Sequence, residues 1–194
     1  MRGSIFALAV ALTTFAACSS PPEEPILQQF FRASRLNDAT SLASFATTSF
    51  QPQSQGSISS FDIVSVSPEK REPLRLAAVA DEVQAEWSKL RDESTQHARK
   101  VAEAQRKLKT ESGMVRLSVD NPAAPVDPTK RTGELVSKDV TITANVRTAD
   151  GGSAERTLVV TLQRAVLQGE PAVEGKWIVT GVRDATSPAG SKTS

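Results

Sequence analysis

The clearest pattern in the chain is an alternation of apolar and polar residues toward its C-terminal end. Segments 140–147 and 157–163 both alternate with a period of two, which is typical of strands that bury one face. Asp150-Gly151-Gly152 between them predicts a hairpin turn. A third strand is expected over 176–183, after a connection from Gly169 to Gly175. Together these segments predict a curved antiparallel meander. The apolar positions of the first two strands are Val140, Ile142, Ala144, Val146, Leu158, Val160 and Leu162.

A helical period opens the globular part of the chain. Apolar residues in 26–36 fall on one stripe, and Arg32 and Arg35 fall on the face directed to water. Asn37-Asp38 then offers a cap for a second, shorter helix over 41–45.

A polar loop over 51–56 follows the second helix. The alternating segment 61–67 predicts the first strand, which Pro68 stops. The segment 121–131 holds three prolines and is expected to be a loop.

The middle of the chain predicts one long helix over about 73–111. Pro73 suits the first turn of a helix, and apolar residues recur at steps of three and four from Leu76 to Leu108. Gly113 ends the pattern, and 114–119 is expected to be a short strand. Two interpretations of the helix stay open. It either packs on the sheet at one end and is solvated at the other, or it forms an arm whose seam pairs with a partner or a second copy.

These elements predict an α+β fold, in which N-terminal helices and one long helix pack on a curved antiparallel sheet. The helical start, Ile26 to Phe45 with Phe30-Phe31, and the ending Gly175-Lys176-Trp177-Ile178-Val179 resemble the NTF2-like (cystatin-like) superfamily. That resemblance implies a cone-shaped pocket. The long helix departs from the family pattern and resembles an insertion over the mouth of the cone.

The N-terminus has the pattern of a secretory signal. Met1-Arg2 is positive, and the apolar run from Ile5 to Ala17 is shorter than the roughly 20 residues that cross a bilayer. The alternative, an ordinary hydrophobic helix, fits less well because the run breaks abruptly into Cys18-Ser19-Ser20-Pro21-Pro22.

Phe15-Ala16-Ala17-Cys18 resembles the lipobox of bacterial lipoproteins, with Phe15 in place of the usual Leu. The resemblance implies a signal peptide over 1–17, cleavage before Cys18, and acylation (palmitate or a similar chain) of Cys18. It also implies a cell-envelope location. In a Gram-negative cell, Ser19 resembles the signal for the periplasmic face of the outer membrane rather than the inner membrane. Residues 18–25 are expected to be a proline-rich tether, 26–184 the domain, and 185–194 a disordered tail.

Composition narrows the function. The 194 residues carry 23 Lys and Arg and 22 Asp and Glu, a formal net charge of +1 that gives no field for nucleic acid. The single Cys is assigned to lipid, so no internal disulfide is expected, and the single His cannot form a multi-histidine metal site. We expect no metal and no cofactor.

Candidate site residues are few. His97 is a general base only in principle, Asp38 is better explained as a helix cap, and Asp62 is a candidate by order alone. Trp87, His97 and Trp177 are the candidate contacts for a partner or ligand, although the two tryptophans also fit apolar core positions. No catalytic residue is predicted.

The sequence therefore predicts a non-enzymatic, lipid-anchored envelope protein whose NTF2-like domain binds a protein partner or a small ligand. Two alternatives stay open. One is a small-molecule isomerase or dehydratase that uses the cone pocket, and the other is a structural protein that bridges membrane and cell wall.

Overall fold

The computed structural model describes residues 21–74, 76–89, 95–119, 127, 131–148 and 150–185. Within the helices, the side chains of residues 77, 86–89 and 95–97 lie outside this description. The elements are α1 (Glu24–Arg35), α2 (Ala39–Leu42), α3 (Pro52–Gln55), β1 (Ser57–Val66), β2 (Lys70–Pro73), α4 (Leu76–Lys89), α5 (Thr95–Val119), β3 (Gly133–Arg147), β4 (Ser153–Leu167), β5 (Val173–Glu174) and β6 (Ile178–Asp184).

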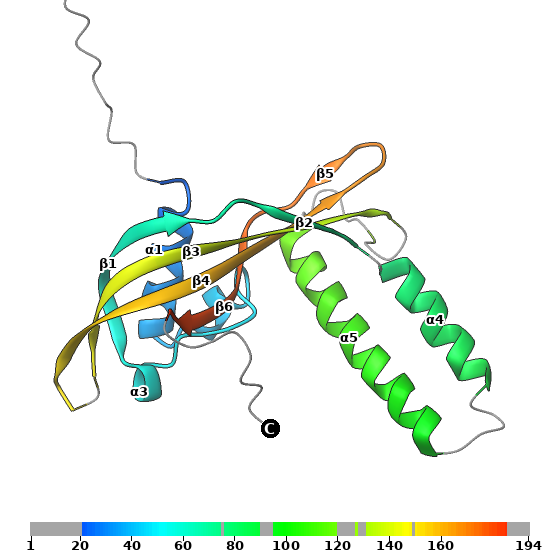
Figure 1. Cartoon of the computed structure of the whole chain (residues 1–194), viewed down its shortest axis with the longest axis horizontal. Coiled ribbons are helices and arrows are strands. Elements are labelled where there is room, and N and C mark those ends of the chain that lie inside the picture. The colour runs from blue at the N-terminus through cyan, green and yellow to red at the C-terminus, as the bar shows by residue number, and fades with distance from the viewer. Residues whose placement is uncertain are drawn as a thin grey trace, which may run out of the picture.

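A long hairpin of β3 and β4 forms the centre of an antiparallel sheet. The two strands stay in one unbroken register from Gly133 opposite Leu167 to Arg147 opposite Ser153. β1 and β2 pair with successive stretches of β3, and β5 and β6 pair with successive stretches of β4. The predicted meander is confirmed as β3, β4 and β6, and the sheet curves strongly along the hairpin (Figure 1).

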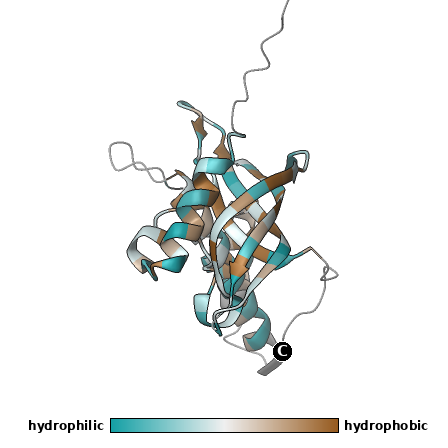
Figure 2. Cartoon of the chain, turned by 90° about the vertical axis from the view of Figure 1, so that its left-hand side faces the viewer, coloured by the Kyte–Doolittle hydropathy of each residue, from teal (hydrophilic) through white to brown (hydrophobic). Residues whose placement is uncertain are grey.

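The hairpin buries its two faces at opposite ends. Successive residues of a strand point to opposite faces, so the even-numbered and odd-numbered residues of β3 and β4 form separate surfaces. Figure 2 shows polar and apolar residues alternating along these strands.

The even-numbered face near the hairpin turn packs against the N-terminal helices. Leu27, Phe30 and Phe31 of α1 lie on one stripe because they are spaced three and four residues apart. Each such side chain, once buried, contributes roughly 1.5–3 kcal/mol to folding. The sheet side of this core consists of Ile58, Val140, Ile142, Ala144, Val146, Leu158, Val160, Leu162 and Val179.

The odd-numbered face at the far end of the hairpin packs against α5. Val115 and Val119 at the end of α5 contact Ala165 and Leu167 of β4, together with Leu76 at the start of α4. The second core therefore attaches the α4–α5 pair to the sheet.

The prediction of one long helix over 73–111 is wrong. The structure has two helices, α4 and α5, which lie side by side and extend away from the sheet as a helical hairpin (Figure 1). Val83 of α4 and Val101 of α5 are both buried. One continuous helix would leave most of this apolar seam in water, whereas two helices side by side cover it. We call this pair of helices the arm.

Other predicted boundaries also differ. Residues 114–119 form the last turns of α5 rather than a strand, because Met114, Val115 and Val119 share a helical face that β4 covers. Pro73 ends the edge strand β2, and α4 begins at Leu76. The polar loop 51–56 contains the short helix α3, and β1 begins at Ser57, four residues before the prediction.

The architecture is thus α+β, with helices on an antiparallel sheet, as the sequence predicts. Among the described residues no helix is long and apolar enough to cross a membrane. The predicted lipidation residue Cys18, the signal 1–17, residues 19–20 of the tether, most of the loop 121–131 and the tail beyond Ala185 lie outside the described residues. The predicted tether 18–25 overlaps the fold at its end, because α1 begins at Glu24 and Glu23 is buried beside Lys138.

Candidate functional site

Of the three predicted contact residues, Trp87, His97 and Trp177, the structure describes the side chain of Trp177 alone. Trp87 lies on α4 and His97 on α5, but their side chains are outside the described part of the chain. Their roles stay predictions. Trp177, just before β6, is partly buried against the core beneath α1.

Trp177 is surrounded by the chain's own cations. Lys138 Nζ lies 4.1 Å from the centroid of the indole ring, and Arg164 Cζ lies 4.6 Å from it. Both distances fall within the range of cation–π attraction. Lys138 also forms an ion pair with Glu23 at 2.5 Å, and Arg164 pairs with Glu69 and Glu174. The indole is therefore a packed side chain within a charged network, which favours its structural interpretation.

Asp38 acts as the helix cap that the sequence predicts. Its carboxylate accepts hydrogen bonds from the Ser41 hydroxyl at 2.6 Å and from the Ser41 backbone N–H at 3.0 Å. These two bonds, the hydroxyl first, lower the pKa of Asp38 because they favour the ionised form. Asp62 is exposed on β1, on the sheet face opposite to that of Phe61. The two carboxylates do not form a paired acid–base site.

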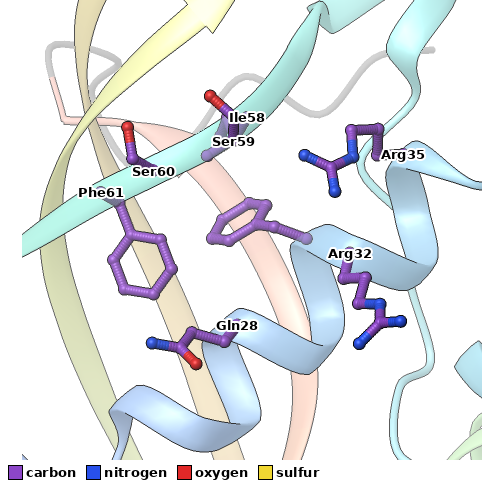
Figure 3. A pocket seen from close by; sticks show the side chains of 8 residues that line it. Gln28, Arg32, Arg35, Ile58, Ser59, Ser60 and Phe61 are labelled. Atoms are coloured by element: carbon purple, nitrogen blue, oxygen red, sulfur yellow. The ribbon is translucent and has the colours of Figure 1, made fainter.

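A recess that combines apolar and charged side chains lies between α1 and β1 on the described surface. It has a volume of about 340 Å³ (Figure 3). Gln28, Arg32 and Arg35 rise from successive turns of α1 because they are spaced four and three residues apart. Phe61 extends from β1 toward the helix, with its ring 5.6 Å from that of Phe31. We call this recess the α1–β1 groove. Its remaining lining residues are Ile58, Ser59 and Ser60.

The α1–β1 groove is positively charged. Arg32 and Arg35 are exposed, and neither forms an ion pair with a carboxylate among the residues that the structure describes. Both lie in the last turn of α1, where the partial negative charge of the helix end stabilises cations. The groove therefore presents two available guanidinium groups beside an aromatic floor.

A second recess, of about 310 Å³, lies where the arm meets the sheet. It brings Leu74, Met114 and Leu135 together with Glu72, Lys107 and Glu111. Lys107 and Glu111 lie 3.9 Å apart, so part of its charge is balanced internally. Mixed charge and apolar lining make this recess a less selective surface than the α1–β1 groove.

Sequence reasoning identified Arg32 and Arg35 as solvent-facing but did not identify the groove. The signal that was missing is the position of β1, because nothing in the local pattern places strand 57–66 alongside α1. Within the described ranges no cluster of three or more His, Cys, Asp or Glu residues could hold a metal ion.

Comparison with known proteins finds no relative of this chain. No protein-family model, no curated protein and no solved structure matches the chain.

Proposed function

We propose that the protein is a lipid-anchored cell-envelope protein whose NTF2-like α+β domain is non-enzymatic and binds a protein partner. The anchor is the acylated Cys18 that the lipobox resemblance implies. Two or three acyl chains hold a protein durably at a bilayer, since each buried methylene contributes about 0.8 kcal/mol.

The observation that carries the binding role is the filled face of the sheet beneath α1. Leu27 and Phe30 of α1 meet Ile142, Leu158 and Leu162 of the sheet, and these side chains are almost completely buried. Enzymes of the NTF2-like class hold their substrates between helix and sheet. Here apolar side chains from both layers occupy that space, which favours a recognition site on the surface over a pocket in the interior.

The short connection to the lipid supports a function close to the membrane. Four residues, Ser19 to Pro22, separate Cys18 from Glu23, so even a fully extended chain places these two residues at most roughly 18 Å apart. Glu23 is buried at the start of α1 and is held by Lys138 of β3. The start of α1 therefore faces the bilayer in the anchored protein.

The test compares the native protein with Cys18→Ser in membrane fractionation, together with intact-mass measurement of the native chain. We expect the native chain to begin at an acylated Cys18 and to fractionate with membranes, and Cys18→Ser to lose that association. Ser19→Ala is the matched control and should remain in the membrane fraction. A native protein that retains Met1 and a free thiol would contradict the anchor.

The partner is tested in cells by crosslinking through photoreactive residues placed at Gln28 in the α1–β1 groove and at Arg99 on the arm. A protein captured from Gln28 supports recognition by the domain. Retention on purified peptidoglycan, with no protein captured from either site, would instead support the structural alternative.

A further inference from the structure

Strand β1 is an edge of the sheet. It pairs with β3 along one side, and no described strand pairs with its other side. An open edge presents unpaired backbone N–H and C=O groups, and proteins usually block such edges with charges, prolines or a covering element.

β1 is only lightly blocked. Its exposed residues include a single charged side chain, Asp62, and the apolar residues Val64 and Val66, whose exposed fractions are 62 % and 38 %. Two irregularities in the pairing with β3, at Ser59 and at Val64, leave an uninterrupted run from Ser60 to Ile63. That run provides a template of about four residues for another strand.

The groove and the edge belong to one surface. The α1–β1 groove includes Ser59, Ser60 and Phe61 of that strand. A strand added to β1 points every second side chain toward the α1 side of the sheet, so its side chains reach the groove between Phe61 and the helix. Proteins bind extended peptides with an edge strand that lies beside a groove. The backbone hydrogen bonds supply affinity, and the groove supplies selectivity.

The charge of the groove selects the partner. Arg32 and Arg35 have no carboxylate partner among the described residues, and Asp62 points to the opposite face of the sheet. Guanidinium groups bind carboxylates with two parallel hydrogen bonds. A second copy of the chain would offer β1 with Asp62 as its single acid, which complements the arginines poorly.

We propose that the α1–β1 groove binds an extended acidic segment of a partner protein, which adds to β1 as a further strand. This inference rests on the proposed function as a protein-binding domain and names the chemistry of its partner. The side chains of the segment that point toward α1 are acidic: their carboxylates pair with Arg32 and Arg35, and their methylene groups contact Phe61.

The first experiment measures fluorescence anisotropy of labelled eight-residue peptides with the full-length protein in detergent. One peptide alternates Val and Glu, and the other alternates Val and Lys. The Glu peptide should bind more tightly, by up to about thirtyfold, since two exposed ion pairs contribute up to about 1 kcal/mol each. Arg32→Glu with Arg35→Glu should reverse the preference. Arg99→Glu with Arg106→Glu, which makes the same charge change on the arm, should leave it unchanged.

A second measurement tests strand addition itself. A strand uses the N–H groups of every second residue along one edge, so N-methylation of one alternate set of peptide amides should abolish binding and methylation of the other set should not. Equal effects of the two sets would overturn strand addition. An unchanged Glu preference in the Arg32→Glu, Arg35→Glu variant would overturn the groove as the site.

Sedimentation of the protein alone tests the alternative that the α1–β1 groove binds a second copy of the chain. Concentration-dependent dimers that the Arg32→Glu, Arg35→Glu variant abolishes would overturn the acidic partner in favour of a second copy. The peptide result does not depend on the lipid. If the chain binds the Glu peptide but carries no acyl group, only the anchor is contradicted. If the chain is acylated but does not bind the Glu peptide, only this inference is contradicted.

Discussion

Ser118, near the end of α5, and Gly175, just before β6, lie in direct van der Waals contact. A Cβ atom on residue 175 would overlap the Ser118 hydroxyl and would come within 2.9 Å of the Ala165 carbonyl oxygen. The Ser118 hydroxyl donates to the Lys176 carbonyl at 2.9 Å and accepts from the Ala165 N–H at 2.9 Å. The Lys176 N–H donates to the Ser118 carbonyl, also at 2.9 Å. This small cluster fastens the arm to β4 and to the start of β6.

Removal of the Ser118 hydroxyl should destabilise the protein. Ser118→Ala removes the hydroxyl that the buried Ala165 N–H and the part-buried Lys176 C=O bond to, so the free energy of unfolding should fall by about 1–3 kcal/mol. Gly175→Ala should cost a similar or larger amount because the added methyl overlaps Ser118. Urea unfolding followed by circular dichroism measures both. Ser112→Ala, on the same helix, is the control and should change stability by less than about 0.5 kcal/mol.

The ion pair between Glu23 and Lys138 predicts a non-additive mutant cycle. Both side chains are nearly buried, with exposed fractions of 7 % and 10 %. Either Glu23→Leu or Lys138→Met leaves one buried charge unpaired and should cost about 3–5 kcal/mol. The double variant Glu23→Leu, Lys138→Met removes both charges and should be much closer to the native protein. The four unfolding curves give the coupling energy directly. Additive losses would show that the two charges act independently.

The helical hairpin of the arm can be distinguished from one straight helix by distance measurement. Spin labels on Ala78 of α4 and Arg106 of α5 should lie close together, because packed helices have axes about 8–10 Å apart. A continuous helix would separate the same positions by roughly 42 Å. Double electron–electron resonance measures the distance. Labels at Arg99 and Lys109 should be about 15 Å apart in either case and serve as the control.

Asp38 predicts a pH-dependent contribution to stability. Its pKa is lowered in the folded protein, so ionised Asp38 stabilises the fold above its unfolded pKa, and that contribution is lost as pH falls through the folded pKa. The urea midpoint of Asp38→Asn should therefore differ most from that of the native protein near neutral pH. The difference should shrink below about pH 4. A constant difference from pH 7 to pH 3 would mean that the carboxylate charge plays no part in the cap.

Patterns that depend on near neighbours were predicted correctly. The alternation in 140–147 and 157–163 predicts the β3–β4 hairpin, because burial of one strand face requires every second residue to be apolar. The stripe of α1 and the cap at Asp38 were predicted for the same reason, since helical spacing and capping involve residues at most four positions apart.

Pairings between distant segments were not predicted. In the sequence, the arm shows one continuous pattern of apolar residues at helical spacing. Only the packing of its two halves against each other divides that pattern into α4 and α5. Residues 114–119 carry apolar side chains that suit a strand or a buried helix equally. Their contact with β4 stabilises the helix.

The candidate site shows the same division. The sequence by itself determined that Arg32 and Arg35 face water and that 61–66 extends as a strand. Only the tertiary structure brought that strand beside α1, through pairing with residues nearly eighty positions away. Such pairing depends on how whole surfaces fit around a shared core, and a local pattern of apolar and polar residues does not encode it.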